Sequence, residues 1–222
     1  MSKGWNNYWK KESEYTYWQQ PDKAVMSLMP GIDRAKVKNV LDLGCGIGRH
    51  AVMLAKEGFK VTAVDSSKEA IRMLRSKAAK EKCKIKIIEG NYAQDLFPAG
   101  SFDFILAFNV IYHGYRGDFE NAVNLVHRWL KPGGLFFFTC PTRKDAKFGS
   151  GEKAAPNTYK PLNSIHPGDL HYFSDETDIA DILKEFTNIQ KEIDEHYWDD
   201  NGVKQFSSYW HISAKKPVKK NR

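Results

Sequence analysis

A glycine-rich turn near the start of the chain joins a strand-like segment to a helix-like segment. Residues 37–43 are mostly apolar and predict a short buried strand, whereas residues 49–57 carry apolar side chains at helical spacing. Between them lie Gly44, Gly46 and Gly48. Glycine tolerates positive φ and lets a ligand approach the backbone closely, and the following helix begins with unpaired N–H groups. The pattern predicts a site for a polar or anionic ligand at the carboxyl end of this strand.

Strand-like and helix-like segments alternate along the rest of the chain, which predicts a mostly parallel sheet with helices on both faces. The expected strands are 37–43, 59–64, 85–88, 102–108, 135–140, 189–197 and 203–214, and the expected helices are 49–57, 66–78, 119–130 and 174–186. Ser66 is the expected N-cap of the second helix, with Glu69 completing a capping box. Asn201-Gly202 predicts a hairpin turn. The fold class is therefore α/β: a doubly wound, mostly parallel seven-stranded sheet with a C-terminal antiparallel hairpin.

Length and composition indicate one domain. The chain has 222 residues, of which 41% are hydrophobic, enough for one core without disulfides. Its three cysteines show no pairing or zinc-binding pattern, so a reducing cytoplasm is expected. No apolar run is long enough to cross a membrane, and no membrane partner is expected. The oligomeric state is expected to be a monomer or a homodimer.

The spacing of the glycines separates two classes of ligand. A dinucleotide site needs Gly-x-Gly-x-x-Gly, but Arg49 occupies the third position. The string Asp-x-Gly-x-Gly-x-Gly from Asp42 to Gly48 instead resembles motif I of the class I S-adenosylmethionine-dependent methyltransferases. In that family the loop packs around the methionine part of the cofactor, and the acidic residue helps to hold its amino end. A dinucleotide-dependent dehydrogenase is the more distant alternative.

Further motifs of this family follow in the expected order over residues 37–140. Asp65 ends the second strand, where an acid can bond both ribose hydroxyls. The turn at Asn91 resembles the adenine-contacting turn, with Asn in place of the usual Asp, and its amide oxygen can also accept a hydrogen bond. The segment from Phe97 to His113, which includes Asn109, resembles the fourth motif, at the catalytic edge. Residues 130–134 resemble the turn before the fifth strand.

The resemblance implies S-adenosylmethionine as the cofactor and S-adenosylhomocysteine as the product. The cofactor-binding residues that it implies are Asp42, Gly44, Cys45, Gly46, Gly48, Asp65, Ser66, Asn91, Tyr92 and Asn109. The reaction would be an in-line displacement at the sulfonium methyl group, in which the protein orients the two reactants.

Histidines are the candidate catalytic residues. His113 follows the fourth strand, where the family places its acceptor, and His171 and His166 lie in a later loop. His113 and His171 are predicted to act on the acceptor; the alternative for each is a hydrogen-bonded structural histidine. His166, His171 and Asp169 could also ligate a metal, but they lack a further ligand in phase, so no metal is expected.

Four parts of the single domain, residues 1–222, have distinct compositions. Residues 1–30 are rich in aromatic side chains and are expected to cap the cofactor, and residues 37–140 form the cofactor-binding core. Residues 141–175 are rich in Gly, Pro, Asn, Lys and Ser, and this insertion after the fifth strand is expected to be a substrate lid. Residues 215–222 form a basic tail.

These observations predict an enzyme that transfers a methyl group to a small-molecule acceptor. The net charge of +7 keeps a second class open, namely a methyltransferase acting on RNA or another nucleic acid. A third is a partner subunit that binds S-adenosylmethionine without catalysis. The fold does not define the acceptor or its reacting atom.

Overall fold

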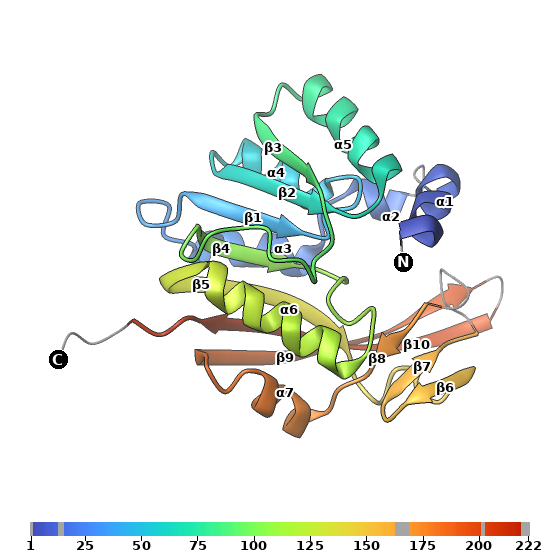
Figure 1. Cartoon of the computed structure of the whole chain (residues 1–222). Helices are drawn as coiled ribbons and strands as arrows, with labels where there is room; N and C mark the ends of the chain where they lie inside the picture. Colours follow the sequence, from blue (N-terminus) through green and yellow to red (C-terminus); the bar gives the residue numbers. More distant parts are fainter. Residues whose placement is uncertain (1, 13–15, 163–168, 201–202, 219–222) are drawn as a thin grey trace.

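The computed structural model describes residues 2–12, 16–162, 169–200 and 203–218. Among these, seven strands form one sheet in the order β3-β2-β1-β4-β5-β10-β9 (Figure 1). The strands are β1 (Asn39–Leu43), β2 (Lys60–Asp65), β3 (Ile85–Glu89), β4 (Phe102–Ala107), β5 (Leu130–Pro141), β9 (Thr187–Asp200) and β10 (Val203–Lys215). The first five are parallel, and β10 pairs antiparallel with both β5 and β9. The predicted fold class is confirmed; the predicted turn at Asn201-Gly202 lies outside the described residues.

Helices cover both faces of the sheet. Side chains of α3 (Lys23–Leu28), α4 (Arg49–Lys56) and α5 (Lys68–Lys80) share one buried cluster with the sheet. Those of α6 (Arg116–Trp129) and α7 (Glu176–Ile182) share another on the opposite face. Each fully buried large side chain in these clusters contributes about 1.5–3 kcal/mol to folding. The sheet is thereby held rigid between two apolar layers, as a doubly wound fold requires.

The strand order reverses between β1 and β4, and this reversal positions the site. Because β1 pairs with β2 on one side and with β4 on the other, the connections that follow these strands diverge at their carboxyl ends. A crevice forms at such a switch point in an open parallel sheet. The residues that follow β1, β2, β3 and β4 therefore meet at one edge.

The boundaries of two predicted helices differ from the sequence analysis. The N-cap of α5 is Ser67, whose hydroxyl accepts a hydrogen bond from the Ala70 N–H at 3.2 Å. The prediction of Ser66 was wrong by one residue, because the carboxylate of Asp65 accepts the Ser67 N–H at 2.8 Å and extends the turn. Glu69 pairs with Arg72 instead of closing a capping box.

The predicted lid segment contains ordered structure. A three-stranded sheet forms from β6 (Glu152–Ala155), β7 (Thr158–Lys160) and β8 (His171–Tyr172). Its strands are too short to produce a recognisable periodicity in the sequence. Helix α7 is also shorter than the predicted helix over 174–186.

The N-terminal residues form α1 (Ser2–Glu12) and α2 (Thr16–Gln19), which the sequence analysis did not assign. Helix α1 lies beside the start of α5 (Figure 1). The Asn6 side-chain oxygen accepts hydrogen bonds from the Ser67 hydroxyl at 2.8 Å and the Glu69 N–H at 3.2 Å. These contacts hold the N-terminal segment at the edge of the sheet where the parallel strands end.

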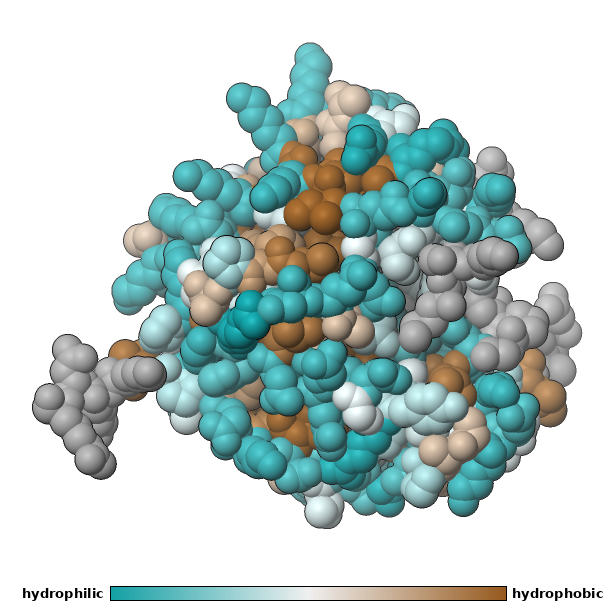
Figure 2. All heavy atoms as spheres, in the orientation of Figure 1, coloured by the Kyte–Doolittle hydropathy of each residue, from teal (hydrophilic) through white to brown (hydrophobic). Residues whose placement is uncertain are grey.

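Hydrophilic residues dominate the face of the molecule seen in Figure 2. Hydrophobic atoms reach this surface mainly over the edge strand β3, whose isoleucines are only partly buried. Across the described ranges, no helix combines the length and the apolar character that crossing a membrane demands.

Candidate active site

A cavity lies at the switch point, at the carboxyl ends of the parallel strands. Its volume is about 840 Å³, a figure that includes open solvent at its mouth. It is lined by residues of four strand ends and of the N-terminal segment: Trp5, Trp9, Trp18, Gly44, Cys45, Gly46, Ile47, Arg49, His50, Asp65, Ser66, Gly90, Asn91, Tyr92, Phe108, Asn109, Val110 and His113. Eight of the ten predicted cofactor-binding residues are among them; Asp42 and Gly48 are not.

The glycine loop folds tightly against the end of β2. The N–H groups of Gly44 and Cys45 both donate to the carbonyl of Val64, at 2.8 and 2.9 Å. A Cβ on Gly44 would lie 2.2 Å from a methyl group of Val110, at a φ of +69°. Only glycine fits at this position, because the Val110 side chain occupies the space that a Cβ would need.

Asp65 links the loop to the start of α5. One carboxylate oxygen accepts the Gly46 N–H and the other accepts the Ser67 N–H, both at 2.8 Å. Burial raises the pKa of Asp65, and these N–H groups act in the opposite direction. Because each carboxylate oxygen has two lone pairs, both can accept a further hydrogen bond from a ligand hydroxyl.

The turn after β3 provides two further lining residues. The Asn91 side-chain oxygen accepts the Ala93 N–H at 2.9 Å, which fixes the amide at the cavity wall. The hydroxyl of Tyr92 donates to the carbonyl of His113 and so joins this turn to the loop after β4.

Asn109 is held in an unusual backbone conformation after β4. Its φ is +56°, a region that non-glycine residues seldom adopt. Its N–H donates to the Thr139 hydroxyl at 2.8 Å, and that hydroxyl donates to the Asn109 side-chain oxygen at 2.7 Å. The resulting sharp turn positions the following residues, Val110 and His113, at the cavity.

Tryptophans of the N-terminal segment form an aromatic wall. Trp9 and Trp18 pack edge to face with centroids 5.4 Å apart, and Trp5 packs edge to face on His113 at 5.1 Å. The Arg49 guanidinium lies 5.1 Å from the ring centroid of Trp18 and 5.3 Å from that of Phe108. The wall therefore joins α1 and α2 to the core at the cavity.

Asp42 and Gly48 are buried but do not line the cavity. Gly48 precedes α4 and faces α5, since a Cβ there would lie 2.1 Å from a methyl group of Leu74. Asp42 is 2% exposed, and burial raises its pKa to about 7, although the nearby Arg49 acts to lower it. Its Oδ2 has no hydrogen-bond partner among the described residues.

The predicted catalytic histidines meet beside the cavity. His113 lines it, whereas His171 on β8 lies behind His113, with ring centroids 4.7 Å apart. His166 lies outside the described residues. Asp169 places a carboxylate oxygen 3.2 Å from His113 Nδ1.

Some lining residues had no predicted role in the site, among them Arg49, His50, Phe108 and Val110. Arg49 and His50 are the first two residues of the helix that follows the glycine loop. That place in the sequence could have identified them as lining residues. His50 is buried, which holds its pKa well below the usual value, and its Nε2 accepts the Asp22 N–H at 3.1 Å.

Comparison with known proteins identifies the family. Residues 40–134 match the family described as a methyltransferase domain. This segment is therefore a methyltransferase domain of the predicted class I S-adenosylmethionine-dependent type. A putative methyltransferase of Geobacillus sp. (strain WCH70) is 31% identical over 136 residues, covering 60% of this chain and 53% of that protein. The chain thus spans about half the length of the first curated relatives it matches.

Solved structures of this family share the fold. A methyltransferase from Methanosarcina mazei superimposes with a TM-score of 0.70 at 18% identity, covering 90% of this chain and 100% of the other. The 1,6-didemethyltoxoflavin-N1-methyltransferase of Burkholderia thailandensis, with bound S-adenosylhomocysteine, superimposes with a TM-score of 0.66 at 17% identity. The match covers 97% of this chain and 84% of the other. The family membership predicted from the glycine loop is confirmed.

Proposed function

We propose that this protein transfers the methyl group of S-adenosylmethionine to a small-molecule acceptor in the switch-point cavity. The observation that carries the proposal is the convergence of Gly46, Asp65, Asn91 and His113 from four strand ends on one cavity. These residues lie far apart in the sequence. A shared ligand site explains why a glycine, a carboxylate, an amide and an imidazole occupy these four positions.

The residues suit the parts of the cofactor. Asp65 is proposed to accept hydrogen bonds from the ribose hydroxyls, and Asn91 from the adenine amino group. Gly44 and Gly46 line the cavity and are proposed to contact the methionine part. S-adenosylmethionine supplies an electrophilic methyl group on a positively charged sulfur.

The protein's contribution is to orient the reactants and exclude water. Holding the acceptor in line with the methyl group can lower the barrier by about 7–11 kcal/mol. Trp5, Trp9 and Trp18 are proposed to attract the sulfonium through their ring faces, worth about 0.5–2 kcal/mol, and to keep water out. In this interpretation residues 1–30 act as the cofactor cap and residues 141–175 as the substrate lid.

A small acceptor is favoured because the N-terminal tryptophans form part of the cavity wall, which limits access by a large polymer. The relative that methylates 1,6-didemethyltoxoflavin at N1 acts on a small molecule and shares this fold. His113 is proposed to contact the acceptor because it lines the same cavity, with His171 supporting it from behind.

Isothermal calorimetry tests the cofactor. Wild-type protein should bind S-adenosylmethionine and S-adenosylhomocysteine but not NADH, and Asp65→Asn should weaken binding. Asp194→Asn, a carboxylate change on the distant hairpin strand β9, is the matched control. Binding of NADH instead would require the methyltransferase proposal to be withdrawn.

Radiolabelled methyl donor then tests the acceptor, with panels of thiols, phenols, amines and small RNAs. Labelling of a small molecule supports the proposal. Selective, salt-sensitive labelling of RNA would favour the nucleic-acid alternative, and cofactor binding without labelling of any panel would favour a non-catalytic subunit.

A further inference from the structure

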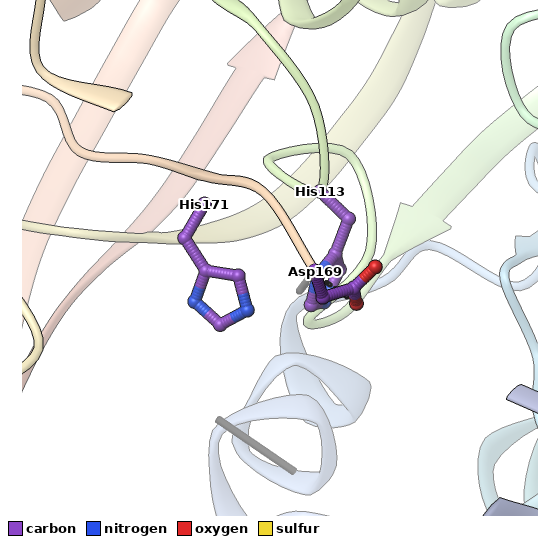
Figure 3. A group of neighbouring side chains, drawn as sticks. All are labelled: His113, Asp169 and His171. Carbon is purple, nitrogen blue, oxygen red and sulfur yellow. Dashed lines mark ion pairs between the residues drawn. The ribbon is translucent and has the colours of Figure 1, made fainter. Parts of the chain in front are cut away.

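Three potential metal ligands from separate parts of the chain meet beside the cavity. His113 follows β4, His171 begins β8, and Asp169 lies two residues before that strand (Figure 3). One ligand atom from each lies within 4.8 Å of the other two. The Tyr172 N–H donates to the Tyr112 carbonyl at 2.9 Å and brings the two segments together.

One polar atom of His113 and one of Asp169 are buried without a hydrogen bond. Nδ1 of His113 and Oδ2 of Asp169 lie 3.2 Å apart, yet neither has a hydrogen-bond partner within the described ranges. Their side chains are only 8% and 11% exposed. Buried polar atoms in proteins nearly always have a partner, so a ligand between these two side chains would satisfy them.

We propose that His113, Asp169 and His171 bind one divalent transition-metal ion, with Zn²⁺ as the best match. Two imidazoles and one carboxylate are a common set of three protein ligands, and they leave coordination positions for another molecule. Imidazole nitrogens favour zinc, iron or copper over magnesium and calcium. The sequence analysis expected no metal because His113, remote in sequence, was not grouped with the other two.

The position of the ion defines the class of acceptor. Because His113 lines the cavity, a molecule bound to the open coordination positions would lie at the cavity wall. A thiol or hydroxyl group is the chemistry that such an ion binds and ionises. The proposal therefore names thiols and acidic hydroxyl compounds as acceptors, and it rests on the proposed methyltransferase function.

The proposed methyl transfer balances in atoms and in electrons. The acceptor loses its S–H or O–H proton to solvent, and its electron pair forms a bond to the methyl carbon. The bond from that carbon to the sulfonium breaks, and its electrons neutralise the sulfur. One proton is released for each methyl group transferred.

Cobalt(II), a spectroscopic substitute for zinc, provides the test. Titration of the metal-free protein should give visible absorption bands that saturate at one ion per chain and disappear when zinc is added. Asp169→Asn and His171→Gln should each weaken cobalt binding by about 100-fold. Losing a residue that only supports a metal ligand already weakens metal binding by about 10- to 100-fold, and these two residues are proposed ligands themselves. The control is His196→Gln, since His196 and Asp194 form an exposed pair 2.9 Å apart that resembles the buried one.

X-ray absorption of the zinc-loaded wild-type protein tests the ligands without any substitution. It should show imidazole and oxygen scattering and no sulfur. Failure of the wild type to bind cobalt, sulfur ligation, or equal affinity of Asp169→Asn and wild type would each overturn the proposal. Calorimetry with S-adenosylmethionine on the same samples separates the two proposals, because cofactor binding without metal binding refutes only the metal site.

Discussion

The substitution Gly44→Ala tests how tightly the glycine loop is packed. Gly44 has a φ of +69°, and an added Cβ would lie 2.2 Å from Cγ2 and 2.6 Å from Cβ of Val110. Val110 is β-branched, so its side chain has few alternative rotamers. Relief of the clash therefore requires a shift of the backbone around Asn109 or of the loop itself.

Two costs add to give the expected loss in the free energy of unfolding. The left-handed backbone conformation costs an alanine about 1–2 kcal/mol. Forcing an extra carbon into a packed region costs about 1–3 kcal/mol. The sum, about 2–5 kcal/mol, is a large part of the roughly 5–15 kcal/mol that stabilises a typical protein.

Gly100→Ala is the matched control. Gly100 has a φ of +67°, but nothing lies within 4 Å of its added Cβ, so only the backbone cost of about 1–2 kcal/mol applies. Urea unfolding followed by far- and near-ultraviolet circular dichroism measures both variants, and coincident transitions check two-state behaviour. Equal stabilities of Gly44→Ala and Gly100→Ala would refute the reasoning.

Three further predictions concern the cavity and its surroundings. The pKa of Asp42 is raised in the folded state to about 7, so its stabilising contribution is present below the unfolded pKa and lost as pH rises through 7. Asp42→Asn should therefore remove about 2–3 kcal/mol of the fall in unfolding free energy between about pH 5 and pH 8, measured by urea titration; an unchanged pH profile would contradict this. Trp5→Ala should weaken S-adenosylmethionine binding by about 2- to 30-fold in calorimetry, whereas the exposed Trp198→Ala should not. Asn91→Asp should tighten binding about fivefold through a charge-assisted hydrogen bond to the adenine amino group, and weaker binding would argue against that contact.

The sheet was predictable from the sequence because its strands are apolar runs bounded by glycines and polar turns. Strands β2 and β3 differ from their predicted bounds by one residue at most. Strand β5 begins five residues earlier than predicted, because Leu130 pairs with Phe102 before the register shifts to Leu135 and Phe104. The sequence analysis treated the intervening Pro and Gly residues as a simple turn.

The site was predictable only where its residues follow strands. Asp65 and Asn91 reach the cavity because the ends of parallel strands converge, a general property of this topology. His113, Asp169 and His171 lie close together for a different reason. A backbone hydrogen bond between Tyr112 and Tyr172 joins two segments that are sixty residues apart in the sequence. No local pattern encodes such a contact.

The aromatic wall gives the protein an internal optical reporter. Three of the chain's six tryptophans, Trp5, Trp9 and Trp18, line the cavity. Indole emission responds to the polarity and charge of its surroundings, so a molecule that enters the cavity changes the signal of half of these fluorophores. Occupancy can therefore be followed by intrinsic fluorescence, without a label and at protein concentrations too low for calorimetry.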